Sequence, residues 1–220
     1  MKAVIFDLDG VIADTVHLYY LANKRIADEV GVAFTKEWNQ QLQGISRKET
    51  IEAFIRQSSQ FYTEEEKVQL GEKKNAFYQE SIQQLTPKDC LPGIRELLAS
   101  LQKEGIKTAV ASSSSNAQAV LHKLELSTLF DHVVDVKTIK YGKPHPEIFL
   151  TAAASLNVKP RDCVAIEDGE AGLQAIQQTD MFSIGVGAHE AMEHADWHVE
   201  STTELTLTHI QKKFAERGRE

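Results

Sequence analysis

Short apolar segments alternate with helical patterns along most of this chain, and this alternation constrains the fold more than any other feature. Between the apolar segments lie helical patterns at 93–104, 116–124, 147–156 and 171–178. Strands that alternate with helices form a mostly parallel sheet that is covered on both faces. The four segments with the character of buried strands are 2–6, 107–111, 163–166 and 182–186, and 197–199 resembles a strand at a sheet edge.

The alternation stops between residues 15 and 84, where the sequence has helical periodicity and no convincing strand. A hydroxyl residue followed three positions later by Glu, at 46–49 and 63–66, is typical of the capping box that begins a helix. We therefore predict an α/β protein with a doubly wound, Rossmann-like core and a helical cap inserted after the first strand. The cap is assigned to 15–84 and the core to 1–14 and 85–220.

Composition narrows the classes of partner. The chain has 24 Lys and Arg against 32 Asp and Glu, a formal net charge of −8. Neutralising the phosphates of a long nucleic acid requires clustered basic residues, so we expect no nucleic-acid partner. A small anionic substrate stays open, because a basic pocket can exist on an acidic surface.

The cysteines and the N-terminal sequence indicate the cellular compartment in which the protein is expected. Cys90 and Cys163 lie far apart and outside any C-x-x-C pattern, so we expect buried free thiols rather than a disulfide or a zinc site. Acidic residues from Asp7 onward interrupt any signal-peptide pattern, and no apolar run has membrane-spanning length. We expect a soluble, cytoplasmic protein with no membrane partner.

Polar residues gather at the predicted strand ends, where open parallel sheets bind ligands. They are Asp7 and Asp9 after the first strand, Ser112 to Asn116 after the second, Lys143 before a helix, and Glu167 and Asp168 after a further strand. Each has an ordinary alternative. D-x-D-G is a common turn, a serine run can cap a helix, a lysine can be solvated, and acidic residues favour a helix N-terminus. Their occurrence together and in this order favours one site.

The charge of this site predicts a metal. Asp7 and Asp9 are two apart, so extended backbone would direct both side chains to the same side. Four close carboxylates repel one another unless a hard cation neutralises them, and oxygen ligands favour Mg²⁺ over zinc. Such a cation and Lys143 would keep Asp7 ionised as a nucleophile, while the Ser112–Ser114 hydroxyls and the helix N-terminus that follows donate to a phosphate.

Four segments resemble the four ordered motifs of the haloacid dehalogenase superfamily. They are Asp7-Leu8-Asp9-Gly10-Val11, the Ser112 region, Lys143-Pro144 and Glu167-Asp168. The resemblance implies that Asp7 is phosphorylated and that Asp9 is general acid and base and gives a backbone carbonyl to Mg²⁺. It also implies that Glu167 and Asp168 complete the metal site, with Ser112 and Lys143 holding the transferring phosphate.

Finer features resemble the β-phosphoglucomutase branch of that superfamily. They are Asp14-Thr15, Gly44-Ile45-Ser46-Arg47, Lys74-Asn75, and Ala111 to Ser114 with Asn116. This resemblance implies a monomer that interconverts β-glucose 1-phosphate and glucose 6-phosphate through an aspartyl phosphate and glucose 1,6-bisphosphate. Four positions depart from the branch: Tyr19 replaces a usual His, Asn23 a Trp, Ser115 a frequent Lys or Arg, and Gly169 a Ser or Ala.

The cap is predicted to hold the far end of a phosphosugar. Arg47, in the first turn of a capped helix, adds its guanidinium to free backbone N–H groups and can bind a second phosphate; the alternative is a solvated arginine. The predicted substrate-binding residues are Thr15, Gly44, Ser46, Arg47, Lys74, Ser113, Ser114 and Asn116.

Three functions remain to be compared. The first is the mutase. The second is a sugar-phosphate phosphatase, which would use the same residues but admit water to the aspartyl phosphate. The third is a non-catalytic binding module, which is disfavoured because every catalytic position is filled.

Overall fold

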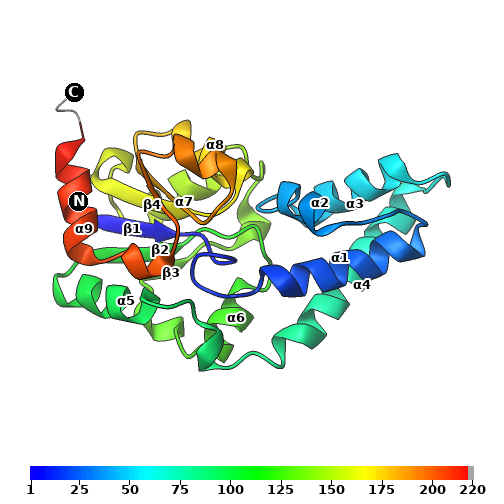
Figure 1. The fold of residues 1–220 in the computed structure, drawn as a ribbon, viewed down its shortest axis with the longest axis horizontal. Coiled ribbons are helices and arrows are strands. Elements are labelled where there is room, and N and C mark those ends of the chain that lie inside the picture. Colours follow the sequence, from blue (N-terminus) through cyan, green and yellow to red (C-terminus); the bar gives the residue numbers. More distant parts are fainter. Residues whose placement is uncertain (218–220) are drawn as a thin grey trace.

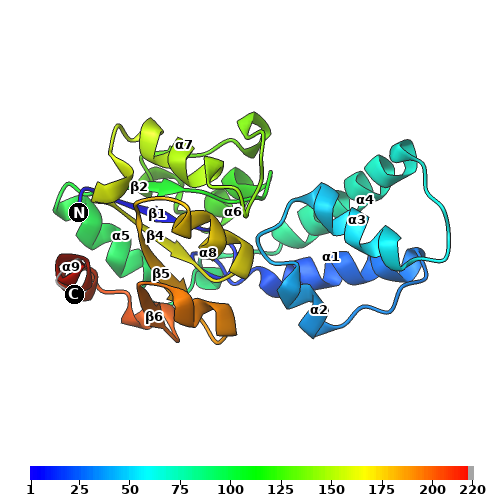
Figure 2. The same ribbon diagram turned by 90° about the horizontal axis from the view of Figure 1, so that it is seen from above.

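The computed structural model, which describes residues 1–217, consists of an α/β core and a helical cap lying beside it (Figures 1 and 2). The core is built on a six-stranded sheet in the order β3-β2-β1-β4-β5-β6, in which every neighbouring pair is parallel. This confirms the predicted parallel α/β fold. The strands are β1 (Ala3–Phe6), β2 (Lys107–Val110), β3 (His132–Val133), β4 (Cys163–Glu167), β5 (Phe182–Val186) and β6 (Trp197–Val199).

Helices cover both faces of this sheet, and the side chains of β1 explain why. Val4 and Phe6 belong to one hydrophobic cluster with residues of α5 and α6, while Ala3 and Ile5 belong to another with residues of α7 and α8. Figure 1 shows these helix pairs on opposite sides of the strands. The core helices are α5 (Ile94–Lys103), α6 (Ala117–Lys123), α7 (Glu147–Ser155), α8 (Glu170–Gln177) and α9 (Leu207–Glu216).

The cap contains helices α1 (Val16–Glu29), α2 (Lys36–Gln41), α3 (Arg47–Gln57) and α4 (Glu64–Ile82), and no strand lies between residues 16 and 84. Both predicted capping boxes are present, at Ser46 and at Thr63. The cap has its own hydrophobic cluster, separate from those of the core. The exact division at 14/15 and 84/85 stays a prediction, and residues 218–220 of the predicted core lie outside the described residues.

The two chain segments that join cap and core are hydrogen-bonded to each other. Ala13 and Cys90 form an antiparallel bridge, the Leu91 N–H donates to the Ile12 carbonyl at 2.9 Å, and the Asp14 N–H donates to the Asp89 carbonyl at 2.9 Å. The cap therefore leaves and rejoins the core at one place, directly after the loop that carries Asp7 and Asp9. We call this paired segment, residues 12–14 and 89–91, the hinge.

Two further observations concern the chain as a whole. Among residues 1–217, no helix combines the length and apolar character needed to cross a membrane. Both cysteines are free, but only Cys163 is buried, whereas Cys90 is partly exposed, so the expectation of two buried thiols was wrong for Cys90.

The cap cluster yields a test of how far its stability depends on packing. Phe54 is fully buried and packs against Phe34 and Trp38, with ring centroids 5.1 and 5.5 Å apart. Phe54→Ala should lower the free energy of unfolding by about 3–5 kcal/mol, because it removes apolar contacts and leaves a cavity. Urea denaturation measures the change.

Phe61, fully exposed in the same cap, is the matched control. Phe61→Ala should stay within about 0.5 kcal/mol of the wild type. Equal losses in the two variants would show that Phe54 is not part of a packed core.

Candidate active site

The candidate residues meet at the carboxyl edge of the sheet because β2, β1 and β4 are neighbours and run in parallel. Asp7 follows β1, Ser112 follows β2, and Glu167 ends β4. Lys143 comes from the segment before α7. Sequence positions separated by up to 160 residues are thus brought to one point by the order of the strands.

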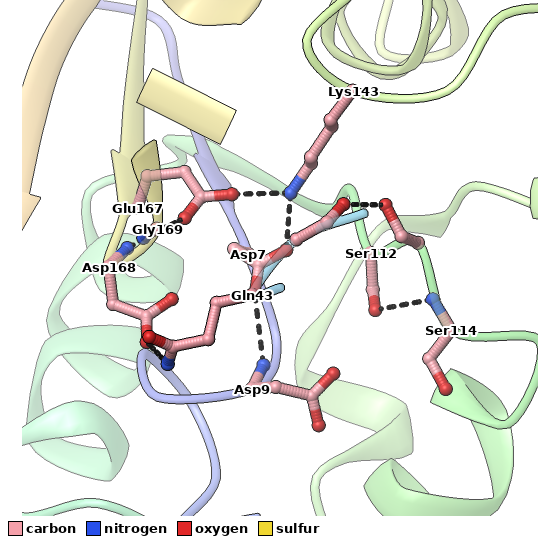
Figure 3. A network of polar contacts seen from close by, with 11 residues as sticks. Asp7, Asp9, Gln43, Ser112, Ser114, Lys143, Glu167, Asp168 and Gly169 are labelled. Atoms are coloured by element: carbon pink, nitrogen blue, oxygen red, sulfur yellow. Dashed lines mark hydrogen bonds and ion pairs between the residues drawn. The ribbon is translucent and has the colours of Figure 1, made fainter. Parts of the chain in front are cut away.

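Lys143 is the centre of this cluster. Its side chain is fully buried, and its Nζ lies 2.5 Å from Asp7 Oδ1 and 2.5 Å from Glu167 Oε1 (Figure 3). Burial alone would lower the pKa of Lys143, but the attraction of the two carboxylates outweighs it and raises the pKa. Lys143 is therefore a permanent cation at neutral pH, placed where a phosphate on Asp7 would need one.

Glu167 is held by the start of α8. Its Oε2 accepts hydrogen bonds from the backbone N–H groups of Asp168 and Gly169, each at 2.7 Å. A Cβ on Gly172 would lie only 1.7 Å from Glu167 Oε1, so the carboxylate occupies space that any other residue at 172 would fill. Glu167 thus reaches Lys143 only because residue 172 is glycine.

Asp168 is packed against the first loop. Gly10 has a φ of +81°, and a Cβ there would lie 2.0 Å from Asp168 Oδ2. The glycine of Asp7-Leu8-Asp9-Gly10 is therefore required both by its left-handed backbone and by the close approach of this carboxylate. On its other side, the same oxygen accepts a hydrogen bond from Gln43 Nε2 of the cap at 2.9 Å.

Asp7, Glu167 and Asp168 can each offer one carboxylate oxygen to a common point, and these oxygens lie within 4.8 Å of one another. Burial raises the pKa of Asp7 to about 7 against the attraction of Lys143, and the charges of Glu167 and Asp9 add to the rise. Burial, and after it the charge of Glu167, raise the pKa of Asp168 well above its usual value. Lys143 alone does not neutralise so much negative charge. An all-oxygen donor set with excess charge fits a hard divalent cation such as Mg²⁺.

Asp9 lies differently from the expectation. The chain bends at Leu8, so the Asp9 N–H donates to Asp7 Oδ2 at 3.0 Å while its carboxylate turns away from the acidic cluster (Figure 3). Asp9 Oδ1 instead accepts hydrogen bonds from Thr15 at 2.5 Å and Tyr78 at 3.2 Å. The expectation that extended backbone directs Asp7 and Asp9 to the same side was wrong. The side chain of Asp9 lies outside the group of carboxylates that can hold a metal.

This carboxyl group is nevertheless suited to proton transfer. Burial raises the pKa of Asp9, and the hydrogen bonds from Thr15 and Tyr78 oppose that rise. A carboxylic acid with a raised pKa retains a proton that it can donate to a leaving oxygen.

A cavity of about 590 Å³ lies between cap and core. It is lined by Asp7, Asp9, Ser112 and Asp168 and by seven of the eight predicted substrate-binding residues: Gly44, Ser46, Arg47, Lys74, Ser113, Ser114 and Asn116. Thr15 is the exception, because it is fully buried beneath Asp9 and does not line the cavity. We correct its assignment from substrate contact to support of Asp9.

The serine loop closes the core side of the cavity. Ser112 Oγ accepts from the Ser114 N–H at 3.0 Å, which fixes the turn between β2 and α6. Ser113 Oγ donates to the Gly44 carbonyl of the cap at 2.6 Å. In this arrangement Ser112 is 2% exposed and lines the same cavity as Asp7, while Ser113 joins cap to core.

Two cations face the cavity from the cap. Arg47 donates to Asn75 at 2.6 Å and crosses the cleft to Ser115 at 2.7 Å. Lys74 is buried, with Nζ 5.6 Å from the Tyr19 ring centroid. Burial and the charge of Arg47 lower the pKa of Lys74 to about 7. An anion in this region would be attracted by both groups.

Sequence reasoning missed several residues of the site. Tyr78 follows Lys74 by four positions on α4, so helical spacing placed it on the same face and could have identified it. Gln43 and Gly172 carried no such signal. Gln43 contacts Asp168 only through the packing of cap on core, and Gly172 is needed only because of where Glu167 points.

The fold and the site together define a capped α/β enzyme with a buried lysine among carboxylates at the carboxyl edge of its sheet. Comparison with known proteins agrees: residues 1–180 match the family of haloacid dehalogenase-like hydrolases, to which this chain belongs. It is 47% identical to the β-phosphoglucomutase of Bacillus subtilis over 97% of this chain and 96% of the relative.

Two further relatives help to place the chain within the family. A crystal structure of β-phosphoglucomutase from Clostridium difficile superposes with a TM-score of 0.94 at 42% identity, covering 98% of each chain. The chain is also similar to a phosphorylated carbohydrates phosphatase of Thermotoga maritima, at 34% identity over 80% of each sequence.

The raised pKa of Asp7 predicts how stability depends on pH. Without a divalent cation, the folded protein holds a proton on Asp7 up to about pH 7, whereas the unfolded chain loses it near its ordinary value of 3.8. Because the folded pKa is the higher one, the stability from Asp7 is fully present below about pH 4 and should fall as pH rises towards 7, by up to about 1.4 kcal/mol per pH unit, and level off above pH 7. Urea denaturation in chelator measures this slope.

Asp7→Asn is the control, since an amide does not titrate. The variant should show a shallower slope, and saturating Mg²⁺ should stabilise the wild type more at pH 8 than at pH 5. Identical slopes for wild type and Asp7→Asn in chelator would contradict the assignment.

Proposed function

We propose that this chain is a β-phosphoglucomutase, which interconverts β-glucose 1-phosphate and glucose 6-phosphate through a phosphorylated Asp7 and glucose 1,6-bisphosphate. The observation that carries the proposal is one cavity with Asp7 on its core wall and Arg47 on its cap wall. A sugar with phosphates at both ends would contact both walls at once. The similarity to two β-phosphoglucomutases over nearly the whole chain supports this assignment.

In the proposed reaction the phosphoryl group moves between Asp7 and a sugar oxygen. Phosphorylated Asp7 gives its phosphoryl group to the 6-hydroxyl of β-glucose 1-phosphate; the bond between the Asp7 oxygen and phosphorus breaks as the bond to the sugar oxygen forms. After the bisphosphate turns round, the Asp7 carboxylate attacks the phosphorus at C1. Glucose 6-phosphate leaves, and phosphorylated Asp7 is restored.

Asp9 would move the proton in each half of this cycle. It takes the proton of the 6-hydroxyl as that oxygen attacks, and it returns the proton to the oxygen at C1 as that oxygen leaves. Its present partners, Thr15 and Tyr78, lie at the base of the cap. A turn of the Asp9 side chain from these partners into the cavity would bring it to the sugar oxygen.

Among the protein's side chains, Lys143 and Ser112 would be the main ones to stabilise the negative charge on the transferring phosphoryl group. The residues that would hold Mg²⁺ are Asp7, Glu167 and Asp168, with the backbone carbonyl of Asp9 implied by family resemblance. Bound there, the cation would supply screening of the negative charge between Asp7 and an incoming phosphate.

The phosphate that does not react would lie against the cap. Arg47, at the first position of α3, offers a guanidinium beside free backbone N–H groups of the helix. Asn116 lies on the opposite side, joined to Asn75 at 2.8 Å. We assign these residues, with Lys74 and Ser114, to the distal phosphate and the sugar.

Hydrolysis of sugar phosphates is the second candidate function. The phosphorylated carbohydrates phosphatase of Thermotoga maritima is 34% identical to this chain over 80% of each sequence. Tyr19, which stacks on Tyr78 with ring centroids 4.0 Å apart, stands where the mutase branch usually has His. If that exchange loosens the coupling between substrate and cap, water reaches the aspartyl phosphate. Small phosphosugars are the substrates in both cases, and we propose a cytoplasmic monomer.

Product analysis separates the two functions. With β-glucose 1-phosphate and a trace of glucose 1,6-bisphosphate, we expect glucose 6-phosphate to form faster than inorganic phosphate, because the closed cap excludes water from Asp7. Both products are followed in parallel. Asp7→Asn, the control, should form neither. Phosphate as the dominant product across several hexose phosphates would assign the chain to the phosphatases.

Arg47 provides a test of the distal phosphate site. Arg47→Ala should lower kcat/KM by about 30-fold, close to 2 kcal/mol, because a charge-assisted hydrogen bond to the phosphate is lost. Steady-state kinetics with β-glucose 1-phosphate measure the effect.

Arg56→Ala, in the exposed last turn of the same helix α3, is the matched control and should retain wild-type kinetics. Unchanged kcat and KM in Arg47→Ala would place this arginine outside the substrate site.

A further inference from the structure

Gln43 lies in the short segment between α2 and α3, and it is the cap residue that touches the predicted metal site. Its Nε2 donates to Asp168 Oδ2 at 2.9 Å, across the boundary between cap and core (Figure 3). Within residues 1–217 no other donor hydrogen-bonds to the Asp168 carboxylate. The orientation of this carboxylate therefore depends on a residue that belongs to the other part of the molecule.

We propose that Gln43 is a positioning residue that holds Asp168 in its metal-binding orientation when the cap lies against the core, so that cap docking and Mg²⁺ binding favour each other. The inference rests on the proposed metal site. A carboxylate has two oxygens, so Asp168 can accept from Gln43 and still offer an oxygen to a cation. Hydrogen-bonded partners of this kind commonly tune metal affinity by 10- to 100-fold.

The approach of Gln43 to the site is built into the neighbouring residues. An added Cβ on Gly169 would lie 3.4 Å from Gln43 Cβ, 3.5 Å from the Gln43 carbonyl oxygen and 3.5 Å from Glu167 Oε2, so the cap segment lies in close contact with the start of α8. On the next residue, the Gly44 carbonyl accepts from Ser113 at 2.6 Å. The segment is thus seated on the core by backbone contact as well as by the Gln43 side chain.

The coupling follows from thermodynamic reciprocity. If docking of the cap places Gln43 against Asp168 and raises the affinity for Mg²⁺, then bound Mg²⁺ must favour the docked cap by the same factor. Arg47 begins α3 four residues after Gln43. A metal bound on the core would therefore help to bring the cap arginine to its place before any sugar arrives.

The test measures Mg²⁺ binding by isothermal titration calorimetry without substrate. Gln43→Met keeps the length of the side chain but removes the N–H donor. We expect its Kd for Mg²⁺ to rise about 10-fold. Gln41→Met, at the exposed last residue of α2, is the matched control and should bind as the wild type does. Urea denaturation of each variant verifies that it is folded.

A second variant and a second readout separate positioning from a general loss of structure. Gln43→Asn keeps the amide but shortens the side chain by one methylene, so its donor should no longer reach Asp168 and Mg²⁺ binding should also weaken. By small-angle scattering, Mg²⁺ should reduce the radius of gyration of the wild type and of Gln41→Met more than that of Gln43→Met. Gln43→Lys also has an N–H donor at this position. We expect it to bind Mg²⁺ weakly as well, because the positive charge of the lysine repels the cation.

The outcomes distinguish this inference from the proposed function. If the wild type binds Mg²⁺ and Gln43→Met binds it equally well, Gln43 has no positioning role and the inference alone is overturned. If the wild type binds no Mg²⁺, the metal site and the inference fall together. Weaker binding by Gln43→Met with an unchanged response in scattering would overturn the coupling to the cap.

Discussion

The buried ammonium of Lys143, held 2.5 Å from both Asp7 and Glu167, is the interaction on which the rest of the site depends. Removing charged groups from water is costly unless they are paired and hydrogen-bonded. Here the neighbouring residues supply both the pairing and the hydrogen bonds. The start of α8 directs two N–H groups to Glu167, and Gly172 leaves the space in which its carboxylate lies. When ionised, Asp7, Glu167 and Asp168 together carry more negative charge than one lysine balances, which is why the site is suited to a cation.

The sequence predicted the parts of this molecule that depend on local pattern or on topology. Apolar segments located β1, β2, β4 and β5, and the capping boxes located the starts of α3 and α4. The meeting of Asp7, Ser112 and Glu167 followed from the rule that parallel strand ends share an edge. β3 has only two residues, too few to show any periodicity.

What the sequence did not predict depends on contacts between distant segments. Asp9 turns away from Asp7 because its own N–H hydrogen-bonds to the Asp7 carboxylate and its side chain meets Thr15 and Tyr78. Gln43 hydrogen-bonds to Asp168 only because the cap is packed on the core. No pattern within a single element carries either fact, since each arises from the relative placement of two elements.

The hinge allows the cap to change during evolution more independently of the core than a segment within the sheet could. The linkers at 12–14 and 89–91 pair with each other, so the cap is inserted at one point of the core. None of the six strands of the sheet includes a residue of α1 to α4. Substitutions at cap positions that do not contact the core can therefore accumulate without disturbing Asp7, Lys143 and Glu167. An ancestor could change the molecules it accepts while keeping its chemistry, and one family can thereby contain proteins named as mutases and as phosphatases.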